Sequence, residues 1–170
     1  QVLNNAGIYD VRIERVSGNL TDHYDPRSKV LRLSDSVYGS TSVAAVGVAA
    51  HECGHAIQHA KGYAALKFRS WLVPVANFGA KIAWPLILIG LLITSKSLTL
   101  LIEIGILAFS LSVLFQIVTL PVEFNASNRA IRCIADTGMM YGNEIVAAKK
   151  VLSAAALTYV ASAASSILQL

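Results

Sequence analysis

Long apolar stretches are the feature that most constrains how this chain can fold. Of its 170 residues, 55% are hydrophobic and only 14% are charged, against about 25% charged residues in ordinary soluble domains. The mean hydropathy is +0.57. A chain of this size has more apolar surface than a single core can bury. The composition therefore predicts an integral membrane protein, mainly α-helical, with its helices arranged as a bundle.

Two apolar runs are predicted to form a transmembrane hairpin. Residues 82–94 are fewer than the roughly 20 that a span needs, so this helix must begin earlier, with Lys81 snorkelling or facing protein. Residues 98–120 are long enough to cross back, after a tight connection at residues 95–97. Residues 151–170 are uncharged and rich in Ala and Ser. They form either a third span packed through small residues or a helix buried against the bundle.

The charges and cysteines indicate how the chain lies in the membrane. The formal charge is +4, but the cations flank apolar segments and form no basic run with interleaved aromatics. This pattern predicts contact with the bilayer and no nucleic-acid partner. Lys96 is the one cation in the hairpin loop, so the positive-inside rule places the other side in the cytoplasm. Cys53 and Cys133 form no CxxC spacing, which predicts free reduced thiols in a cytosolic environment.

The sequence His51-Glu52-Cys53-Gly54-His55 has the zincin pattern of two histidines four residues apart with a glutamate after the first. On a helix, both imidazoles then lie on one face and can reach a single Zn²⁺ at about 2.0–2.1 Å. The glutamate lies beside the metal, where it can take a proton from the attacking water and pass it to a leaving amine. The motif therefore predicts a catalytic zinc site with a glutamate as general base.

The residues around this motif predict a well-defined helix. Hydroxyls at residues 40–42 can cap its start, residues 43–60 continue it, and Lys61-Gly62 can end it with a cation and a C′ glycine. Most of its residues are small, which allows other helices to approach closely. We therefore expect this helix to lie buried within a helical bundle.

Residues 1–40 are predicted to form a small antiparallel sheet near the cleft. Residues 11–14 alternate with period two, and a Pro-containing turn at residues 25–28 separates two further strand-like segments. In many zincins an edge strand beside the metal helix pairs with the extended substrate. Residues 30–34 are the candidate for this strand; the alternative is a plain sheet that caps the fold.

A catalytic zinc needs a third protein ligand and one open position. The hairpin must return the chain at Pro121 to the side on which the histidines lie. Glu123 emerges there, at the predicted start of a new helix, and is the candidate third ligand. The alternative is that Glu123 only favours its own helix N-terminus electrostatically. Asp136, on the same helix, is the reserve ligand.

Four segments together carry a family resemblance: Asp22-His23-Tyr24-Asp25-Pro26, Leu31-Arg32-Leu33-Ser34, Ala49 to Gln58, and Leu120-Pro121-Val122-Glu123-Phe124. This combination resembles the YugP-like family of neutral zinc metallopeptidases, membrane gluzincins related to the HtpX-type proteases. The resemblance implies a zinc-dependent membrane endopeptidase with His51, His55 and Glu123 as ligands and Glu52 as general base. The related proteases often carry an aspartate where this chain has Ser127, so the group that orients the histidines is left open.

Several other polar residues could contact a substrate or transition state. His23 lies by a turn and could donate to an oxyanion. Asn125 could bind the substrate backbone or cap a helix. His59 is rotated roughly 80° from His51 around the helix axis and is better explained as a rim histidine than as a ligand. Further candidates for substrate or transition-state contacts are Tyr24, Arg129 and Tyr141.

The sequence thus predicts one membrane-embedded zinc metallopeptidase domain. Its parts are a small sheet (1–40), the HExxH helix (41–62), the hairpin (about 76–120), the third-ligand region (121–150) and an apolar helix (151–170). We expect a peptide or protein substrate, membrane-embedded or misfolded, and a bacterial cytoplasmic membrane with the site facing the cytoplasm. The family resemblance also leads us to expect a span before Gln1.

Two alternatives remain open at this stage. A site-two-type intramembrane protease would hold HExxH within a span and take its third ligand from an Asp-Gly motif, which Asp136-Thr137-Gly138 matches poorly. A zinc-stabilised or metal-free membrane scaffold without activity would need no catalytic glutamate.

Overall fold

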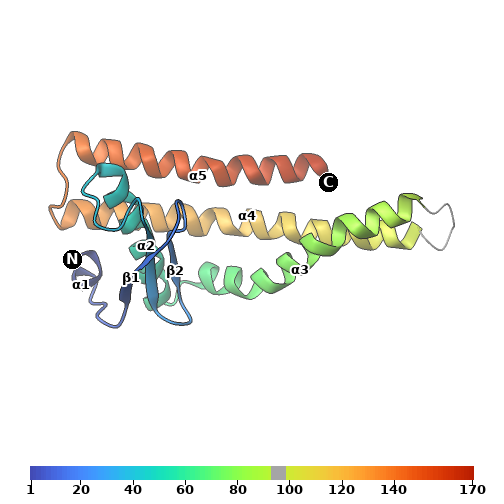
Figure 1. Cartoon of the computed structure of the whole chain (residues 1–170), viewed down its shortest axis with the longest axis horizontal. Coiled ribbons are helices and arrows are strands. Elements are labelled where there is room, and N and C mark those ends of the chain that lie inside the picture. Colours follow the sequence, from blue (N-terminus) through green and yellow to red (C-terminus); the bar gives the residue numbers. More distant parts are fainter. Residues whose placement is uncertain (93–98) are drawn as a thin grey trace. The chain divides into compact units, whose positions relative to one another are not determined.

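The computed structural model describes residues 1–92 and 99–170 and confirms a mainly helical fold with a small sheet near the N-terminus (Figure 1). In chain order the elements are α1 (Val2–Asn5), β1 (Arg12–Val16), β2 (His23–Asp25), β3 (Val30–Ser34), α2 (Val43–Ala60), α3 (Ala64–Leu92), α4 (Thr99–Asp136) and α5 (Asn143–Gln169). The predicted connection at Ser95-Lys96-Ser97 lies outside the described residues.

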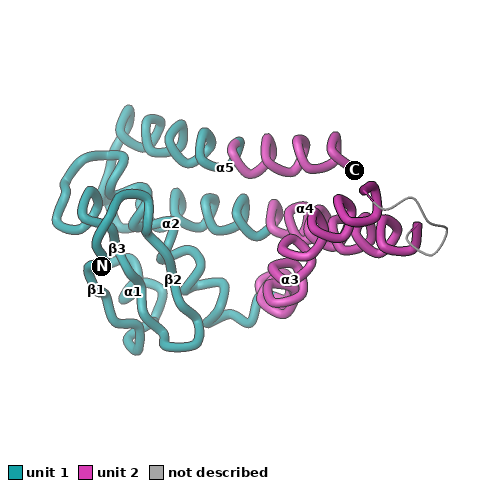
Figure 2. Tube along the Cα trace, turned by 45° about the vertical axis from the view of Figure 1, so that its right-hand side comes forward, with its two compact units in different colours: residues 1–63, 122–157 teal, residues 64–121, 158–170 magenta. Residues whose placement is uncertain are grey.

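The chain divides into two compact units (Figure 2). Unit 1 comprises residues 1–63 and 122–157, and unit 2 comprises residues 64–121 and 158–170. Unit 1 therefore holds the sheet and α2, unit 2 holds α3, and α4 and α5 each contribute to both.

The sheet is mixed rather than antiparallel, and its strand order is β1-β3-β2. β2 pairs with β3 in antiparallel fashion, but β1 pairs with β3 in parallel, with Arg12 opposite Val30. The reason lies in the segment between β1 and β2, which passes the end of β3: the Asp22 carboxylate accepts hydrogen bonds from the backbone N–H and hydroxyl of Ser34. This crossing places β1 and β2 on opposite sides of β3. The prediction that residues 30–34 form an edge strand is therefore wrong.

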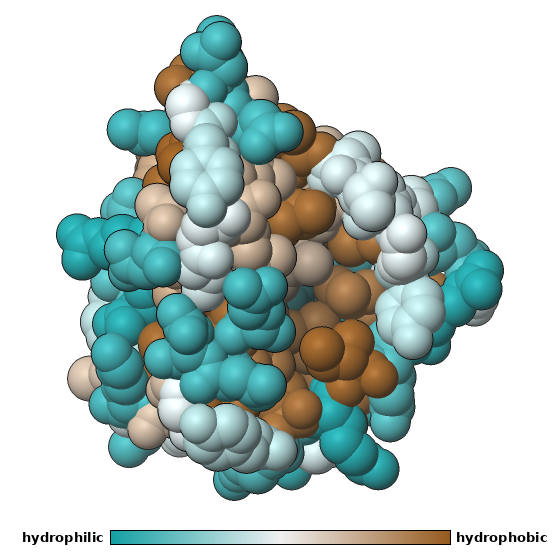
Figure 3. All heavy atoms as spheres, turned by 90° about the vertical axis from the view of Figure 1, so that its left-hand side faces the viewer, coloured by the Kyte–Doolittle hydropathy of each residue, from teal (hydrophilic) through white to brown (hydrophobic). Residues whose placement is uncertain are grey.

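The sheet region has the surface of a segment in contact with water. Exposed ion pairs cross it, such as Arg15 Nε with Asp35 Oδ1 at 2.6 Å and Arg32 Nε with Glu14 Oε2 at 3.5 Å. On the face of the molecule drawn in Figure 3, hydrophilic side chains surround a central group of hydrophobic ones. Such pairs contribute little stability, but they mark a surface that is not in lipid.

Helix α2 runs from Val43 to Ala60, as the sequence predicts, and its N-cap hydroxyl on Ser42 accepts from Ala45 N–H at 3.2 Å. Its two faces belong to different cores. One core is shared with α1, β3 and the segment after β3, and it includes Cys53, Ala56 and Ile57 of α2. The other includes Ala50 of α2 and buried residues of the α4–α5 region: Ala130, Ile134, Met140, Ala148 and Leu152. The predicted burial of α2 within a bundle is thus confirmed.

Three helices are long and apolar enough to cross a membrane: α3, α4 and α5. Within unit 2, α3 and α4 approach closely at glycines. A Cβ atom added to Gly79 would lie 2.6 Å from the Ala108 carbonyl oxygen, and one added to Gly105 would lie 3.0 Å from that of Ala83. Small residues at such contacts allow membrane helices to pack closely.

Helix α4 continues without a break from Thr99 to Asp136, with Pro121 inside it. The prediction that Glu123 opens a new helix is therefore wrong. Proline removes one backbone hydrogen bond, but long membrane helices tolerate this because neighbouring groups compensate for the lost bond. Helix α3 likewise contains Pro74 and Pro85.

Helix α5 runs from Asn143 to Gln169 as one element. Only 17% of its most apolar window is buried inside the structure. Of the two readings of residues 151–170, this exposure favours a membrane span over a helix buried against the bundle.

The contact between α2 and α4 at Gly54 generates a stability prediction. A Cβ atom at this position would lie 2.5 Å from the Ala126 carbonyl oxygen, a backbone atom that cannot rotate away. We expect Gly54→Ala to lower the free energy of unfolding by about 1–3 kcal/mol through overpacking, measured by thermal unfolding of the purified protein in detergent micelles.

Gly47→Ala is the matched control because it lies on the same helix. A Cβ atom there meets only the Ala148 Cβ, at 3.9 Å. Alanine is favoured over glycine in a helix by about 0.5–1 kcal/mol, so this variant should unfold at the wild-type temperature or above it. Equal destabilisation by both substitutions would contradict the close contact.

Candidate metal centre

Helices α2 and α4 bring together the three predicted metal ligands. His51 Nε2 lies 3.1 Å from Glu123 Oε2, and His55 Nε2 lies 3.4 Å from the same oxygen. The two imidazole rings meet edge to face, with centroids 4.8 Å apart. One ligand atom from each residue lies within 4.8 Å of the others. The i, i+4 spacing on α2 puts both histidines on the face toward α4, where Glu123 projects between them.

The geometry of these donors fits a zinc ion. Two ligand atoms at about 2.0–2.1 Å from a tetrahedral zinc lie about 3.3 Å apart, close to the two separations from Glu123 Oε2. Two nitrogens and one carboxylate oxygen are also a donor set that zinc prefers. The Glu123 side chain is only 3% exposed, and a buried carboxylate is stable only beside compensating positive charge or donors. The site is therefore suited to hold a divalent cation.

The electrostatics of the site also favour a bound cation. Burial opposes a positive charge on His55, but the hydrogen bond and negative charge of Glu123 outweigh it and raise the pKa of this imidazole above its ordinary value. The surroundings that favour a proton here also favour a metal cation. Burial likewise raises the pKa of the neighbouring Glu52 carboxyl, while the two histidines partly offset that effect.

A buried amide orients His55. The Gln58 side chain is wholly buried, and its Nε2 donates to the Val122 carbonyl at 2.8 Å and to Asn125 Oδ1 at 3.0 Å. Its Oε1 therefore faces His55 Nδ1, at 3.0 Å. Because an amide oxygen only accepts, Nδ1 must carry the proton, which leaves Nε2 with a lone pair for the metal. Arg129 Nε completes the chain by donating to Asn125 Oδ1 at 2.7 Å.

Ser127 orients the other histidine. Its Oγ lies 3.1 Å from His51 Nδ1, on the side of the ring away from Glu123. The serine occupies the position at which the related proteases often carry an aspartate. Sequence reasoning left this role open and missed Gln58 altogether. The available signal was spacing, since Gln58 follows His55 by three residues and Ser127 follows Glu123 by four, which are distances at which helical side chains meet.

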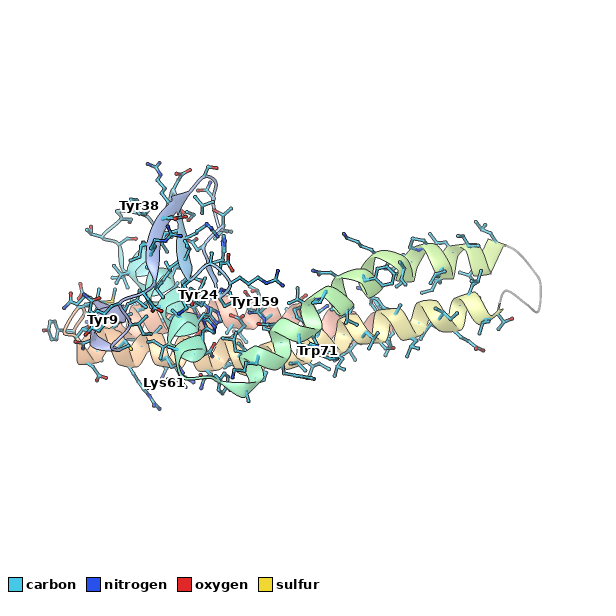
Figure 4. The ribbon with its side chains drawn as sticks, turned by 90° about the horizontal axis from the view of Figure 1, so that it is seen from below. Tyr9, Tyr24, Tyr38, Lys61, Trp71 and Tyr159 are labelled. Atoms are coloured by element: carbon cyan, nitrogen blue, oxygen red, sulfur yellow. The ribbon has the colours of Figure 1, made fainter. Side chains whose placement is uncertain are left out.

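The other candidate residues occupy different surroundings. His23 is exposed on β2, with Nδ1 2.8 Å from the Thr21 carbonyl. Tyr24, labelled in Figure 4, lies on β2. Its hydroxyl lies 2.9 Å from Nδ1 of His59, which places His59 against β2 and outside the ligand cluster. Tyr141, between α4 and α5, is 71% exposed. Asp136 is exposed at the end of α4 and is not part of the cluster.

Cys53 points away from the ligands, as its position on the helix predicts. It lies in the core between α2 and the sheet, and burial raises the pKa of its thiol to about 12. Neither Cys53 nor Cys133 forms a disulfide.

Comparison with known proteins agrees with the site. A sequence model of the family described as "Putative neutral zinc metallopeptidase" matches residues 1–170, and the chain belongs to this family. It is 50% identical over 170 residues to the "Putative membrane protease YugP" of Bacillus subtilis (strain 168), an alignment that covers all of this chain and 74% of the relative. No solved structure gives a significant match. The family resemblance inferred from the sequence motifs is confirmed.

The carboxylate on α4 generates a prediction about metal binding. We expect Glu123→Ala to weaken zinc binding by more than about 100-fold, because loss of an outer hydrogen-bond partner alone typically costs 10–100-fold. Bound zinc can be measured by elemental analysis after dialysis against a zinc buffer. Asp136→Ala is the matched control on the same helix and should retain full zinc; zinc loss in that variant instead would identify Asp136 as the third ligand.

A second prediction compares two substitutions of Ser127, one expected to weaken zinc binding and one expected to restore it. Ser127→Ala removes the hydroxyl beside His51 Nδ1 and should weaken zinc binding by about 10–100-fold. Ser127→Asp replaces it with the carboxylate that the related proteases use and should restore or strengthen binding. Affinities can be compared by competition with a chelator. Equal affinities in all three proteins would show that the serine does not orient the histidine.

Proposed function

We propose that this chain is a zinc-dependent membrane endopeptidase of the gluzincin type. The observation that supports this most strongly is the convergence of His51, His55 and Glu123 on one small volume, with Glu52 on the same helix as the histidines. Family membership supports zinc as the metal. The relative's description as a membrane protease and the three apolar helices support a site of action at a lipid bilayer.

Each residue has a separate task in this proposal. His51, His55 and Glu123 hold the metal, and Gln58 and Ser127 orient the two imidazoles toward it. Bound zinc would supply Lewis acidity, which activates water near neutral pH and polarises the scissile carbonyl. Glu52 accepts a proton from the attacking water and returns it to the leaving amine as the peptide bond breaks.

We assign the substrate to the outer edge of β2. Strand β3 has neighbours on both sides, so it cannot pair with a further strand. Within the described residues β2 pairs only with β3, and its Tyr24 hydroxyl lies 2.9 Å from His59 Nδ1 on α2, the helix that carries Glu52. An extended peptide that added to β2 would gain main-chain hydrogen bonds close to the general base. His23, exposed on this strand, is then the candidate for a side-chain contact to the substrate.

We further propose that the site faces the cytoplasm of a bacterial cell. The cations on the side of the sheet and α2 outnumber those of the hairpin loop, whose Lys96 lies outside the described residues. This asymmetry is the arrangement that the positive-inside rule associates with a cytoplasmic side. Protein segments that are embedded in the membrane or misfolded at its surface are the substrates within reach of such a site.

The site-two alternative finds little support. In the part of the chain that the structure describes, α2 is not among the helices apolar enough to span a membrane. The Asp136 region also does not contribute to the ligand cluster. An inactive zinc-binding scaffold is the remaining alternative, and an activity measurement separates it from an enzyme.

The test of the enzymatic proposal is Glu52→Gln. This change keeps the size of the side chain but removes the base, so cleavage of casein should fall by about 100-fold or more while bound zinc stays at the wild-type level. Cleavage can be followed by gel and mass spectrometry, with chelator-treated wild type as the second negative sample.

Undiminished cleavage by Glu52→Gln would reject this residue as the base. Stoichiometric zinc without cleavage in the wild type, tested on casein and on denatured membrane proteins, would favour the scaffold.

A further inference from the structure

The membrane-spanning helices of unit 2 line a half-open cavity with polar walls. It has a volume of about 330 Å³, and all three helices contribute to its lining. Most of the lining side chains carry amide, hydroxyl or guanidinium groups: Arg69, Asn77, Ser112, Gln116, Thr119 and Ser162. Tyr159, labelled in Figure 4, adds a phenol from α5. Side chains of this kind are costly in hydrocarbon and mark functional positions within membrane helices.

The cavity reaches well below the level of the lipid headgroups. Trp71 on α3, also labelled in Figure 4, is 67% exposed, as aromatic residues at the membrane interface are. Asn77 and Ala80 follow it by six and nine residues, which corresponds to about 9–14 Å along the helix. The hydrocarbon core is about 30 Å thick, so the cavity extends toward its middle.

Some of the polar groups in this cavity are satisfied within the protein, and others are not. Gln116 donates to Ser166 at 2.8 Å and accepts from Ser162 at 3.1 Å, which ties α4 to α5. Thr119 donates to the Phe115 carbonyl. The Asn77 amide, on an exposed side chain, and the half-buried Ser112 hydroxyl have no hydrogen-bond partner among the described residues, so both are open to an occupant of the cavity. At this depth such groups call for a polar occupant, because lipid tails cannot hydrogen-bond to them.

We propose that this cavity binds a hydrogen-bonding side chain of a membrane-embedded peptide segment. The inference rests on the proposed protease function, which requires that substrate segments approach from the bilayer. The lining is dominated by neutral groups that both donate and accept, and these suit the amides and hydroxyls of Asn, Gln, Ser and Thr. Polar side chains hydrogen-bond across membrane helices in the same way.

The depth and charge of the cavity argue against a lipid headgroup as its occupant. A phosphate lies at the interface, whereas Asn77 lies about 9 Å along α3 from the interfacial Trp71. Arg69 is the only charged residue among the lining residues that the structure describes, while pockets for anionic headgroups are typically basic. A polar side chain carried on a membrane-crossing peptide can reach the required depth.

The test uses two model peptides that differ at one position. Both are Leu/Ala transmembrane helices with Lys flanks, and the central residue is Gln in one and Leu in the other. Binding to the Glu52→Gln protein is measured by energy transfer in phosphatidylcholine vesicles, so that cleavage plays no part. We expect the Gln peptide to bind about 3- to 30-fold more tightly, the range that interhelical hydrogen bonds provide.

Substitutions of Asn77 and Ser112 test whether the preference for the Gln peptide arises in the cavity. Asn77→Leu with Ser112→Ala should bring the two peptides to near parity, because it removes the partners of the Gln side chain. Ser110→Ala is the matched control: Ser110 lies two residues from Ser112 on α4, its hydroxyl donates to the Ile106 carbonyl at 2.8 Å, and it does not line the cavity. It should preserve the preference. Thermal unfolding shows that each variant is folded.

Two results would overturn the proposal. Equal binding of both peptides to the unsubstituted cavity would mean that it holds only water. A preference that persists in Asn77→Leu/Ser112→Ala would place the polar contact elsewhere. Because binding is scored without catalysis, failure of the protease assignment would appear separately, as an absence of Glu52-dependent cleavage.

Discussion

The buried carboxylate of Glu123 is the interaction on which the rest of unit 1 depends. Removing an ionised carboxylate from water is costly, so it needs positive charge or donors at contact distance. Both imidazoles of α2 provide them, but only if α2 and α4 lie almost backbone to backbone. Gly54 permits that approach, because any side chain there would meet the Ala126 carbonyl. The sheet then covers the opposite face of α2 through Cys53 and its neighbours.

The surrounding hydrogen bonds determine how strongly this site can polarise a bound metal. His55 is oriented by an amide and His51 by a hydroxyl, and both groups are neutral. Carboxylate partners would raise the basicity of the imidazoles further. With neutral partners, the ligand set brings a single formal negative charge, that of Glu123. A bound divalent cation therefore keeps more of its positive charge, which favours activation of water.

Sequence reasoning was most successful where local signals are strong. Capping residues and the i, i+4 histidines fixed α2 and its metal-binding face, and hydropathy located the spans. Glu123 was identified because the hairpin has to return to the histidines. The errors concern long-range arrangement: strand order depends on how the segment at Asp22 passes β3, and no local pattern encodes that. The sequence also placed the start of a new helix at Glu123, but α4 continues through Pro121, because neighbouring groups compensate for the backbone hydrogen bond that proline removes.

The continuity of α4 has a consequence for how the protein is made. A single helix carries both a membrane-crossing segment and Glu123, and α3 lies between this helix and the two histidines in the chain. His51 and His55 are therefore synthesised first, and Glu123 is synthesised only after α3 and the membrane-crossing part of α4. A nascent chain that has not yet emerged beyond Pro121 lacks the third ligand. The order of synthesis thus delays completion of the candidate metal site until the segments of α3 and α4 that precede Glu123 already exist.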